Sequence, residues 1–177
     1  KARQEGFTTF TCLYFLDECL FNPNVEAAIL AHTKDDAMAI FRRKIQFPYE
    51  NMPDDVRQNI SKTTDSKSSI GFSNGSTISV GTSMRSATLQ YLLISELGKI
   101  AKKFPEKARE IMTGALEAVG SGDTMIFVES TGEGRTGAYY DLCNTAQKHQ
   151  ERGLPLTPMD FRFNFFPWFH SKDYVLD

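Results

Sequence analysis

The stretch that decides the fold is YLLISE, residues 91–96. Its first four residues form a short uninterrupted apolar run, which is typical of a strand buried on both faces of a sheet. The polar pair Ser95-Glu96 follows at once. In open α/β sheets, ligands bind at the carboxyl ends of the strands, so this pair is a candidate for part of a functional site.

The segments on either side of this run alternate between strand-like and helix-like patterns. Strands are predicted at 25–32, 68–72, 76–80, 91–94, 123–128 and 160–166, and helices at 8–21, 35–45, 53–60, 105–119 and 139–152. Asn74-Gly75 joins the second and third strands as a hairpin turn. The alternation predicts an α/β domain, with a largely parallel sheet flanked by helices and a β-hairpin at 68–80.

The composition is that of an ordinary globular domain. The 177 residues are 41% apolar with a formal net charge of -2, enough apolar content for one sizeable core. No apolar run is long enough to span a membrane. The three cysteines and three histidines lack zinc-ligand spacing, and the cysteines fit a reducing, intracellular setting. Without a basic excess, any role on DNA would need other parts of a larger protein or several copies of the chain.

The first nine residues, KARQEGFTT, contain the end of a phosphate-binding loop. Gly6 lets backbone N–H groups face a phosphate, and the hydroxyl of Thr8 is a suitable ligand for Mg²⁺. Phe7 occupies the position of the usual lysine, but Lys1 and Arg3 at the other end of the loop can supply the cation that phosphoryl transfer needs. The alternative interpretation is that Gly-Phe-Thr-Thr simply begins an ordinary helix.

Ser95-Glu96 resembles the Asp-Glu pair that ends a strand in many nucleotide hydrolases. There the Asp holds Mg²⁺ and the Glu polarises the attacking water. Ser95 at the Asp position can orient a metal-bound water but carries no charge, whereas Glu96 keeps the role of general base. The alternative is that Glu96 only caps the next helix.

Two further segments complete the pattern. Glu129-Ser130-Thr131 ends another predicted strand, a usual place for residues that sense the γ-phosphate, although the strand could equally run into a plain glycine-rich turn. Arg85, in the loop MRSAT, is either an arginine finger for a neighbouring subunit or a solvated loop residue. Together the phosphate loop, the arginine loop and the two polar strand ends follow in the order that an ATP motor needs.

Five segments also resemble one known family. They are KARQEGFTT, AHTKDDAMAIF, FSNGSTISVGTSMRSATLQYLLISELGKI, FVESTGEGRTGAYYDLC and FNFFPWF, and they run over nearly the whole chain. In this order they resemble the large terminase subunits of tailed bacteriophages, which package DNA into preformed capsids. The resemblance implies a RecA-like (ASCE) P-loop NTPase core that binds ATP and Mg²⁺.

The resemblance also implies roles for individual residues. Many terminases place the phosphate-loop cation at the beginning of the loop, so Lys1 is the expected phosphate lysine and Arg3 a second, catalytic cation. The other expected nucleotide-binding residues are Gln4, Gly6, Phe7, Thr8, Thr9, Glu129, Ser130 and Thr131. Glu96 and Arg85 are the expected catalytic residues beside Arg3, and Thr8, Ser95 and Glu96 are expected around the metal.

The expected function is ATP hydrolysis that drives double-stranded DNA into a procapsid. The resemblance implies a homo-oligomeric ring with a portal protein and a small terminase subunit, in the host bacterial cytoplasm and away from membranes. Residues 1–177 are expected to be one ATPase domain, without the strand before the phosphate loop and without the nuclease, and 167–177 to begin a linker. Two alternatives remain: another nucleic-acid-dependent ATPase such as a helicase, or a non-catalytic assembly module, which Phe7 and Ser95 favour.

Overall fold

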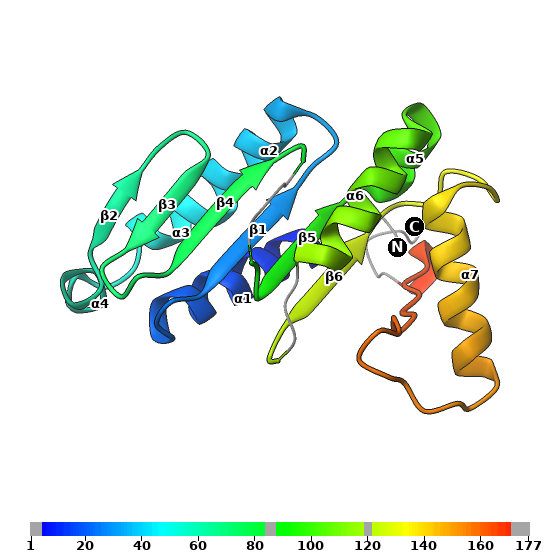
Figure 1. The fold of residues 1–177 in the computed structure, drawn as a ribbon. Helices are drawn as coiled ribbons and strands as arrows, with labels where there is room; N and C mark the ends of the chain where they lie inside the picture. The colour runs from blue at the N-terminus through cyan, green and yellow to red at the C-terminus, as the bar shows by residue number, and fades with distance from the viewer. Residues whose placement is uncertain (1–4, 84–87, 119–121, 171–177) are drawn as a thin grey trace.

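The computed structural model describes residues 5–83, 88–118 and 122–170. A six-stranded sheet in the order β2-β3-β4-β1-β5-β6 carries helices on both faces (Figure 1). The strands are β1 (Glu26–Leu30), β2 (Lys62–Asp65), β3 (Ser69–Phe72), β4 (Thr77–Gly81), β5 (Tyr91–Ser95) and β6 (Met125–Glu129). The helices are α1 (Phe7–Phe21), α2 (Lys34–Phe41), the π-helix η1 (Arg42–Gln46), α3 (Phe47–Glu50), α4 (Asp54–Asn59), α5 (Leu97–Lys103), α6 (Pro105–Ala118), α7 (Ala138–Glu151) and the 3₁₀-helix η2 (Trp168–His170).

The sheet is parallel where the predicted site lies and antiparallel at one side. β4, β1, β5 and β6 pair in parallel, whereas β2, β3 and β4 pair antiparallel to one another. The hairpin predicted from Asn74-Gly75 is confirmed as β3 and β4. It belongs to the main sheet, because β4 also pairs with β1 in the centre.

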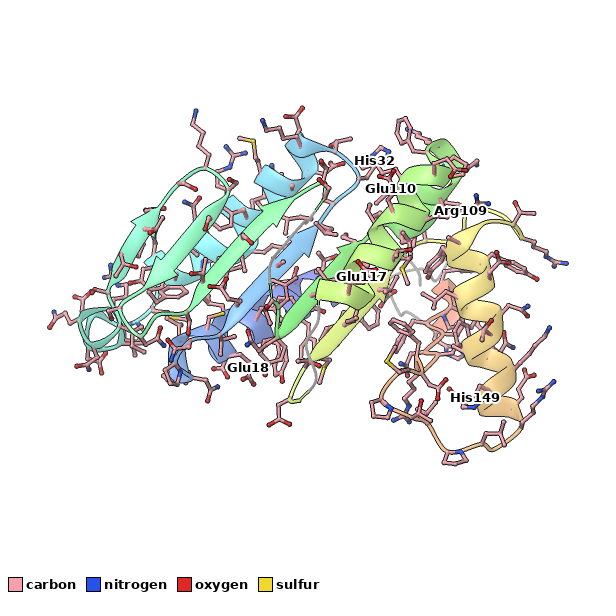
Figure 2. The ribbon with its side chains drawn as sticks, in the orientation of Figure 1. Glu18, His32, Arg109, Glu110, Glu117 and His149 are labelled. Atoms are coloured by element: carbon pink, nitrogen blue, oxygen red, sulfur yellow. The ribbon has the colours of Figure 1, made fainter. Side chains whose placement is uncertain are left out.

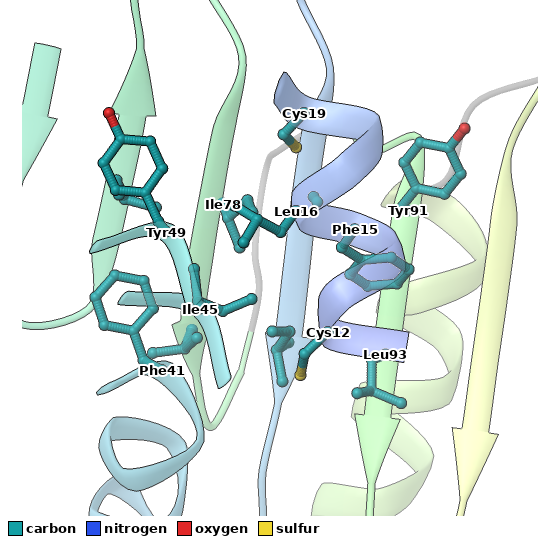
Figure 3. Close-up of a cluster of buried hydrophobic side chains, with 14 of the residues drawn as sticks. Cys12, Phe15, Leu16, Cys19, Phe41, Ile45, Tyr49, Ile78, Tyr91 and Leu93 are labelled. Carbon is teal, nitrogen blue, oxygen red and sulfur yellow. The ribbon is translucent and has the colours of Figure 1, made fainter. Parts of the chain in front are cut away.

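The helices divide the core into two layers. Cys12, Phe15 and Leu16 of α1 pack with Tyr91 and Leu93 of β5 on one face of the sheet (Figure 3). The intervening residues of β5 pack with α5 and α6 on the other face. Side chains alternate along a strand, so a run buried on both faces must be apolar throughout, as predicted. The same alternation directs the next residue, Ser95, to the α1 face.

The turn from α1 into β1 is held by the β3–β4 hairpin. Nδ2 of Asn74 donates to the carbonyl oxygens of Cys19, Leu20 and Asn22, at 2.9, 3.1 and 3.1 Å. These contacts satisfy carbonyls that the end of a helix leaves without partners. Gly75 has φ 86°, the left-handed conformation that an Asn-Gly turn uses.

The helix predicted at 35–45 runs further than expected. The prediction ended it before Phe47-Pro48, but α2, η1 and α3 continue to Glu50. In η1 the N–H of Phe47 donates to the carbonyl of Arg42, five residues earlier. This wider turn interrupts the usual i to i−4 ladder directly before Pro48, which has no N–H to give.

The strand predicted at 160–166 is wrong. That segment pairs with no strand among the described residues, although its aromatic and polar residues alternate as in a strand. β2 and α5 were not predicted; β2 is a short edge strand with three of its four residues exposed, and α5 is only seven residues long. Among the helices of the described residues, none has the length and apolar character needed to cross a membrane.

Candidate nucleotide and metal site

The candidate site lies where the carboxyl ends of β5 and β6 meet the start of α1. Ser95 and Glu129 are Cα partners in the parallel register of these two strands. In-register neighbours of a parallel pair project to the same face of the sheet. Both side chains therefore point to the face covered by α1, where Thr8 lies in the first turn.

A carboxylate joins these three elements. Oε1 of Glu129 accepts hydrogen bonds from Oγ1 of Thr8 and from Oγ of Ser95, the latter at 3.0 Å. Ser95 is buried, while Thr8 and Glu129 are half-buried. Two hydroxyls and one carboxylate from distant parts of the chain therefore form one cluster of oxygen atoms, partly open to solvent.

The start of α1 is suited to an anion. Gly6 precedes the helix with φ 76°, and the first turn carries no acidic residue. The carbonyl of Gly6 accepts from the N–H of Phe10 at 2.8 Å, so the helical ladder begins there. The N–H groups of the first turn have no acceptor within the helix, and the helix dipole makes this end favourable for negative charge.

Glu96 occupies a backbone conformation that is rare for its residue type. Its φ is 59°, in the left-handed region, which costs a residue with a Cβ about 1–2 kcal/mol. Oε2 of Glu96 lies 3.2 Å from Nζ of Lys99 and accepts from Oγ1 of Thr131 at 3.3 Å. The side chain makes no capping hydrogen bond to α5, so helix capping does not explain this glutamate. Strained residues of this kind concentrate at functional sites.

Ser130 faces the other side of the sheet and ties the strand end to two helices. Its side chain is only 1% exposed, and its Oγ accepts from the N–H of Gly98 at 3.1 Å. The hydroxyl of Tyr139 donates to the carbonyl of Ser130 at 3.3 Å, and burial raises the pKa of this tyrosine. A Cβ on Gly98 would lie 2.7 Å from Oγ of Ser130, so the close approach of α5 to the strand end requires glycine.

A small cleft of about 220 Å³ adjoins Ser95 and Glu96 on the side of β1. It brings in basic side chains from η1 and α5, namely Arg43, Lys44 and Lys99. His32 follows β1 at the same edge of the sheet, opposite to the edge marked by Glu18 (Figure 2). Sequence reasoning did not assign Lys99 to the site. Its position three residues after Glu96 at the start of a helix was the available signal.

A larger cavity of about 730 Å³ lies beyond Glu129, between α1, β6, α7 and the segment 161–166. Its lining is mainly aromatic and aliphatic, and its volume is in the range of ligand pockets. The ring of Phe7 packs against the ring of Phe166 with the centroids 4.3 Å apart. Phe7 therefore serves as a wall of this cavity.

The structure brings together several of the predicted site residues but not all of them. Thr8, Ser95 and Glu129 form one cluster, and Glu96 and Thr131 form a second beside it. Thr9 is exposed, and Ser130 lies on the opposite face. The predictions for Lys1, Arg3, Gln4 and Arg85 fall outside the described residues.

Comparison with known proteins finds the same fold in solved structures, among them two phage large terminases. The HK97 bacteriophage large terminase aligns with a TM-score of 0.66 and 15% identity, over 86% of this chain and 33% of its own. The large terminase ATPase domain of Thermus phage P74-26 aligns with a TM-score of 0.58 and 16% identity, over 80% of this chain and 61% of its own. No protein-family model and no curated protein matches the chain. This chain spans less than two thirds of either structure, and the likeness confirms the predicted α/β, RecA-like fold.

Proposed function

We propose that this chain hydrolyses ATP and forms the ATPase part of a motor that drives double-stranded DNA into a viral procapsid. The observation that carries the proposal is the convergence of Thr8, Ser95, Glu96 and Glu129 at one edge of the sheet, beside the start of α1. The shared fold with two large terminases supports it. The motif order along the chain is the one that such a motor requires.

The oxygen cluster fits Mg²⁺ with a bound nucleotide. Hydroxyl and carboxylate oxygens are the ligands that this ion takes, and it is usually held by one or two carboxylates together with phosphates. Among the described residues, no three His, Cys, Asp or Glu side chains gather into a group that could hold a metal ion by themselves. When bound, the ion would neutralise charge on the β- and γ-phosphates.

Other residues of the chain would bind the phosphates and activate the attacking water. The first-turn amides of α1 would hold phosphate oxygens, with Lys1 and Arg3 as the proposed cations of the loop. Glu96 would orient and polarise the attacking water, since Lys99 and Thr131 hold its carboxylate in one place. Arg85 would act on the nucleotide of a neighbouring subunit.

The end of β6 connects the candidate site to helices α5 and α7. The N–H of Glu96 donates to the carbonyl of Glu129 at 2.7 Å, so the two strand ends are tied directly. The next residue, Ser130, contacts α5 and α7. A shift of β6 on loss of the γ-phosphate would therefore reach both helices, and we propose this as the coupling between hydrolysis and DNA movement.

The wider assembly follows from the same proposal. We propose a homo-oligomeric ring in the host bacterial cytoplasm, working on double-stranded DNA with a portal protein and a small terminase subunit. The net charge of -2 is consistent with a grip shared among several copies. β6 pairs with β5 alone among the described strands, which supports a further strand beside β6 that leads into the phosphate loop. The start of a linker expected at 167–177 falls largely outside the described residues, which end at His170.

The test is ATP turnover with magnesium in wild type, Glu96→Gln and the matched control Glu106→Gln. Both glutamates form an i,i+3 ion pair near a helix start, Glu96 with Lys99 and Glu106 with Arg109, but only Glu96 lies at the site. Loss of a general base costs about 10²–10⁴-fold in rate. We expect such a loss in Glu96→Gln and wild-type turnover in Glu106→Gln. Equal turnover in all three would refute the assignment of Glu96, and no turnover in wild type, with or without DNA, would favour the non-catalytic assembly module.

A further inference from the structure

We infer that Glu129 supplies the metal-binding carboxylate of this site, in place of the residue at position 95, and that Thr8 and Ser95 complete its protein ligands. This inference rests on the proposed function and assigns Glu129 a role different from the nucleotide-sensing one that its sequence position suggests. It resolves a difficulty at the end of β5. The expected acidic ligand is replaced there by Ser95, whose hydroxyl brings no charge to balance a divalent cation.

The register of the sheet explains how a residue of β6 can supply the carboxylate that is expected on β5. Ser95 and Glu129 are paired across β5 and β6 and project to the same face. Neighbouring strands lie about 4.8 Å apart, a distance that the longer glutamate side chain can span. Oε1 of Glu129 does reach back to within 3.0 Å of Oγ of Ser95, so the negative charge lies beside the position that the sequence left neutral.

The second contact of Glu129 points to a ligand cluster. Oε1 also accepts from Oγ1 of Thr8, the hydroxyl that the phosphate-loop pattern assigns to the metal. Oxygens that share an octahedral Mg²⁺ at about 2.0–2.1 Å lie about 2.9 Å apart along an edge of the octahedron. The separation between Ser95 and Glu129 is close to that value. The hydroxyls donate to the carboxylate here, and their lone pairs stay available to an ion.

The other nearby carboxylate is occupied differently. Oε2 of Glu96 contacts Lys99 and Thr131. The backbone of Glu96 is in the left-handed conformation, unlike that of an ordinary strand residue. Two acidic residues therefore have two sets of partners. Glu129 lies with the hydroxyls that suit a metal, whereas Glu96 lies with Lys99 and Thr131, which hold its carboxylate apart from that cluster.

The competing explanation is that Glu129 only anchors the first turn of α1 to the sheet. Glu129→Gln separates the two, because the amide oxygen still accepts from Thr8 and Ser95 but carries no charge. A second variant, Ser95→Asp with Glu129→Gln, returns a carboxylate to β5. Glu133→Gln is the control, since Glu133 follows the same strand end but forms its ion pair with Lys102 of α5.

The experiment measures metal binding directly, by water-proton relaxation during a titration with Mn²⁺, first without nucleotide and then with ADP. We expect Glu129→Gln to weaken Mn²⁺ binding at least about tenfold, the lower end of what changes around a metal site cost. We expect the double variant to recover most of that loss and Glu133→Gln to match wild type. Circular dichroism and the melting temperature of each variant show whether it is folded.

The outcomes separate this inference from the proposed function. Weakened Mn²⁺ binding in Glu129→Gln together with rescue in the double variant supports the inference, even if ATP turnover is absent. Unchanged Mn²⁺ binding in Glu129→Gln, or no Mn²⁺ binding by wild type with or without ADP, overturns it. If Glu129→Gln binds Mn²⁺ as wild type does while Glu96→Gln still abolishes turnover, the ATPase proposal stands and only the metal assignment is lost.

Discussion

The contact between Gly98 and Ser130 predicts a specific cost for Gly98→Ala. A Cβ at this position would lie 2.7 Å from Oγ of Ser130 and 3.1 Å from the carbonyl oxygen of Thr131. The first of these groups is almost fully buried and the second is backbone, so neither can move away easily. Helix α5 must shift outward, and the hydrogen bond between Gly98 N–H and Ser130 is lost or weakened.

The magnitude follows from three opposing contributions. Replacing glycine by alanine inside a helix stabilises it by about 1 kcal/mol. Overpacking a filled site costs about 1–3 kcal/mol, and leaving the buried hydroxyl of Ser130 with a poorer partner costs about 1–3 kcal/mol more. We therefore expect Gly98→Ala to lower the free energy of unfolding by about 1–5 kcal/mol. At about 2–4 °C per kcal/mol for a chain of this size, the melting temperature falls by several degrees.

Urea unfolding followed by circular dichroism measures this difference, with Gly132→Ala as the matched control. Gly132 lies two residues after Ser130, and a Cβ there would meet nothing within 4 Å. The control is expected to stay within about 0.5 kcal/mol of wild type, as substitutions away from special features do. Equal stability of Gly98→Ala and Gly132→Ala would refute the argument, since the close approach of α5 to the strand end would then carry no constraint.

Three further predictions concern stability. Asn74→Ala removes the donor to three carbonyls at the end of α1 and should lower the free energy of unfolding, measured in urea, by about 2 kcal/mol. The control Asn51→Ala should lower it by about 0.5 kcal/mol, because Nδ2 of Asn51 donates to a single carbonyl on the surface. Glu96→Gly should be more stable than Glu96→Ala by about 1 kcal/mol, because only glycine adopts φ 59° without strain; the reverse order, which helix propensity alone predicts, would contradict this. Burial raises the pKa of Cys12 to about 12 from its ordinary 9.0. The buried thiol therefore contributes its full stability below pH 9, and this contribution is lost as the pH rises toward 12. Over that range the free energy of unfolding falls by up to about 1.4 kcal/mol per pH unit. Cys12→Ala should flatten the stability profile between pH 9 and 10, and a profile parallel to that of wild type would contradict the assignment.

The fold was largely predictable because its signals are local. The apolar run at 91–94, the Asn-Gly turn at 74–75 and the amphipathic pattern at 139–152 each correspond to an observed element. The errors arose where the signal depends on a partner. The alternation at 160–166 resembles a strand, but a strand requires a neighbour to pair with. Pro48 suggests a helix end, and only the π turn before it allows the helix to continue.

The site was predictable in its residue types and less so in its connections. The strand-end rule selected Ser95, Glu96 and Glu129 correctly as neighbours at one edge of the sheet. It could not reveal the hydrogen bond between Glu129 and Thr8. That contact depends on the pairing of Ser95 with Glu129, 34 residues apart in the sequence, and on the placement of α1 over both strands. Nor could it find Lys44, which lies in the π-helix η1 and lines the cleft beside Ser95 and Glu96.

The two departures from the expected nucleotide-site pattern, Phe7 and Ser95, have related physical consequences. Relative to that pattern each lacks one charge: Phe7 stands where a lysine is expected, and Ser95 stands where an aspartate is expected. A site that lost only the cation would repel its nucleotide, and a site that lost only the anion would hold its metal poorly. The side chain of Glu129 restores negative charge beside Ser95, and Lys99 and Lys44 bring positive charge to the same edge of the sheet. If the proposed function holds, the charges that phosphoryl transfer needs would be supplied from strands and helices other than those of the expected pattern. For this reason, the absence of a motif residue argues against activity only after the neighbouring strand ends have been examined.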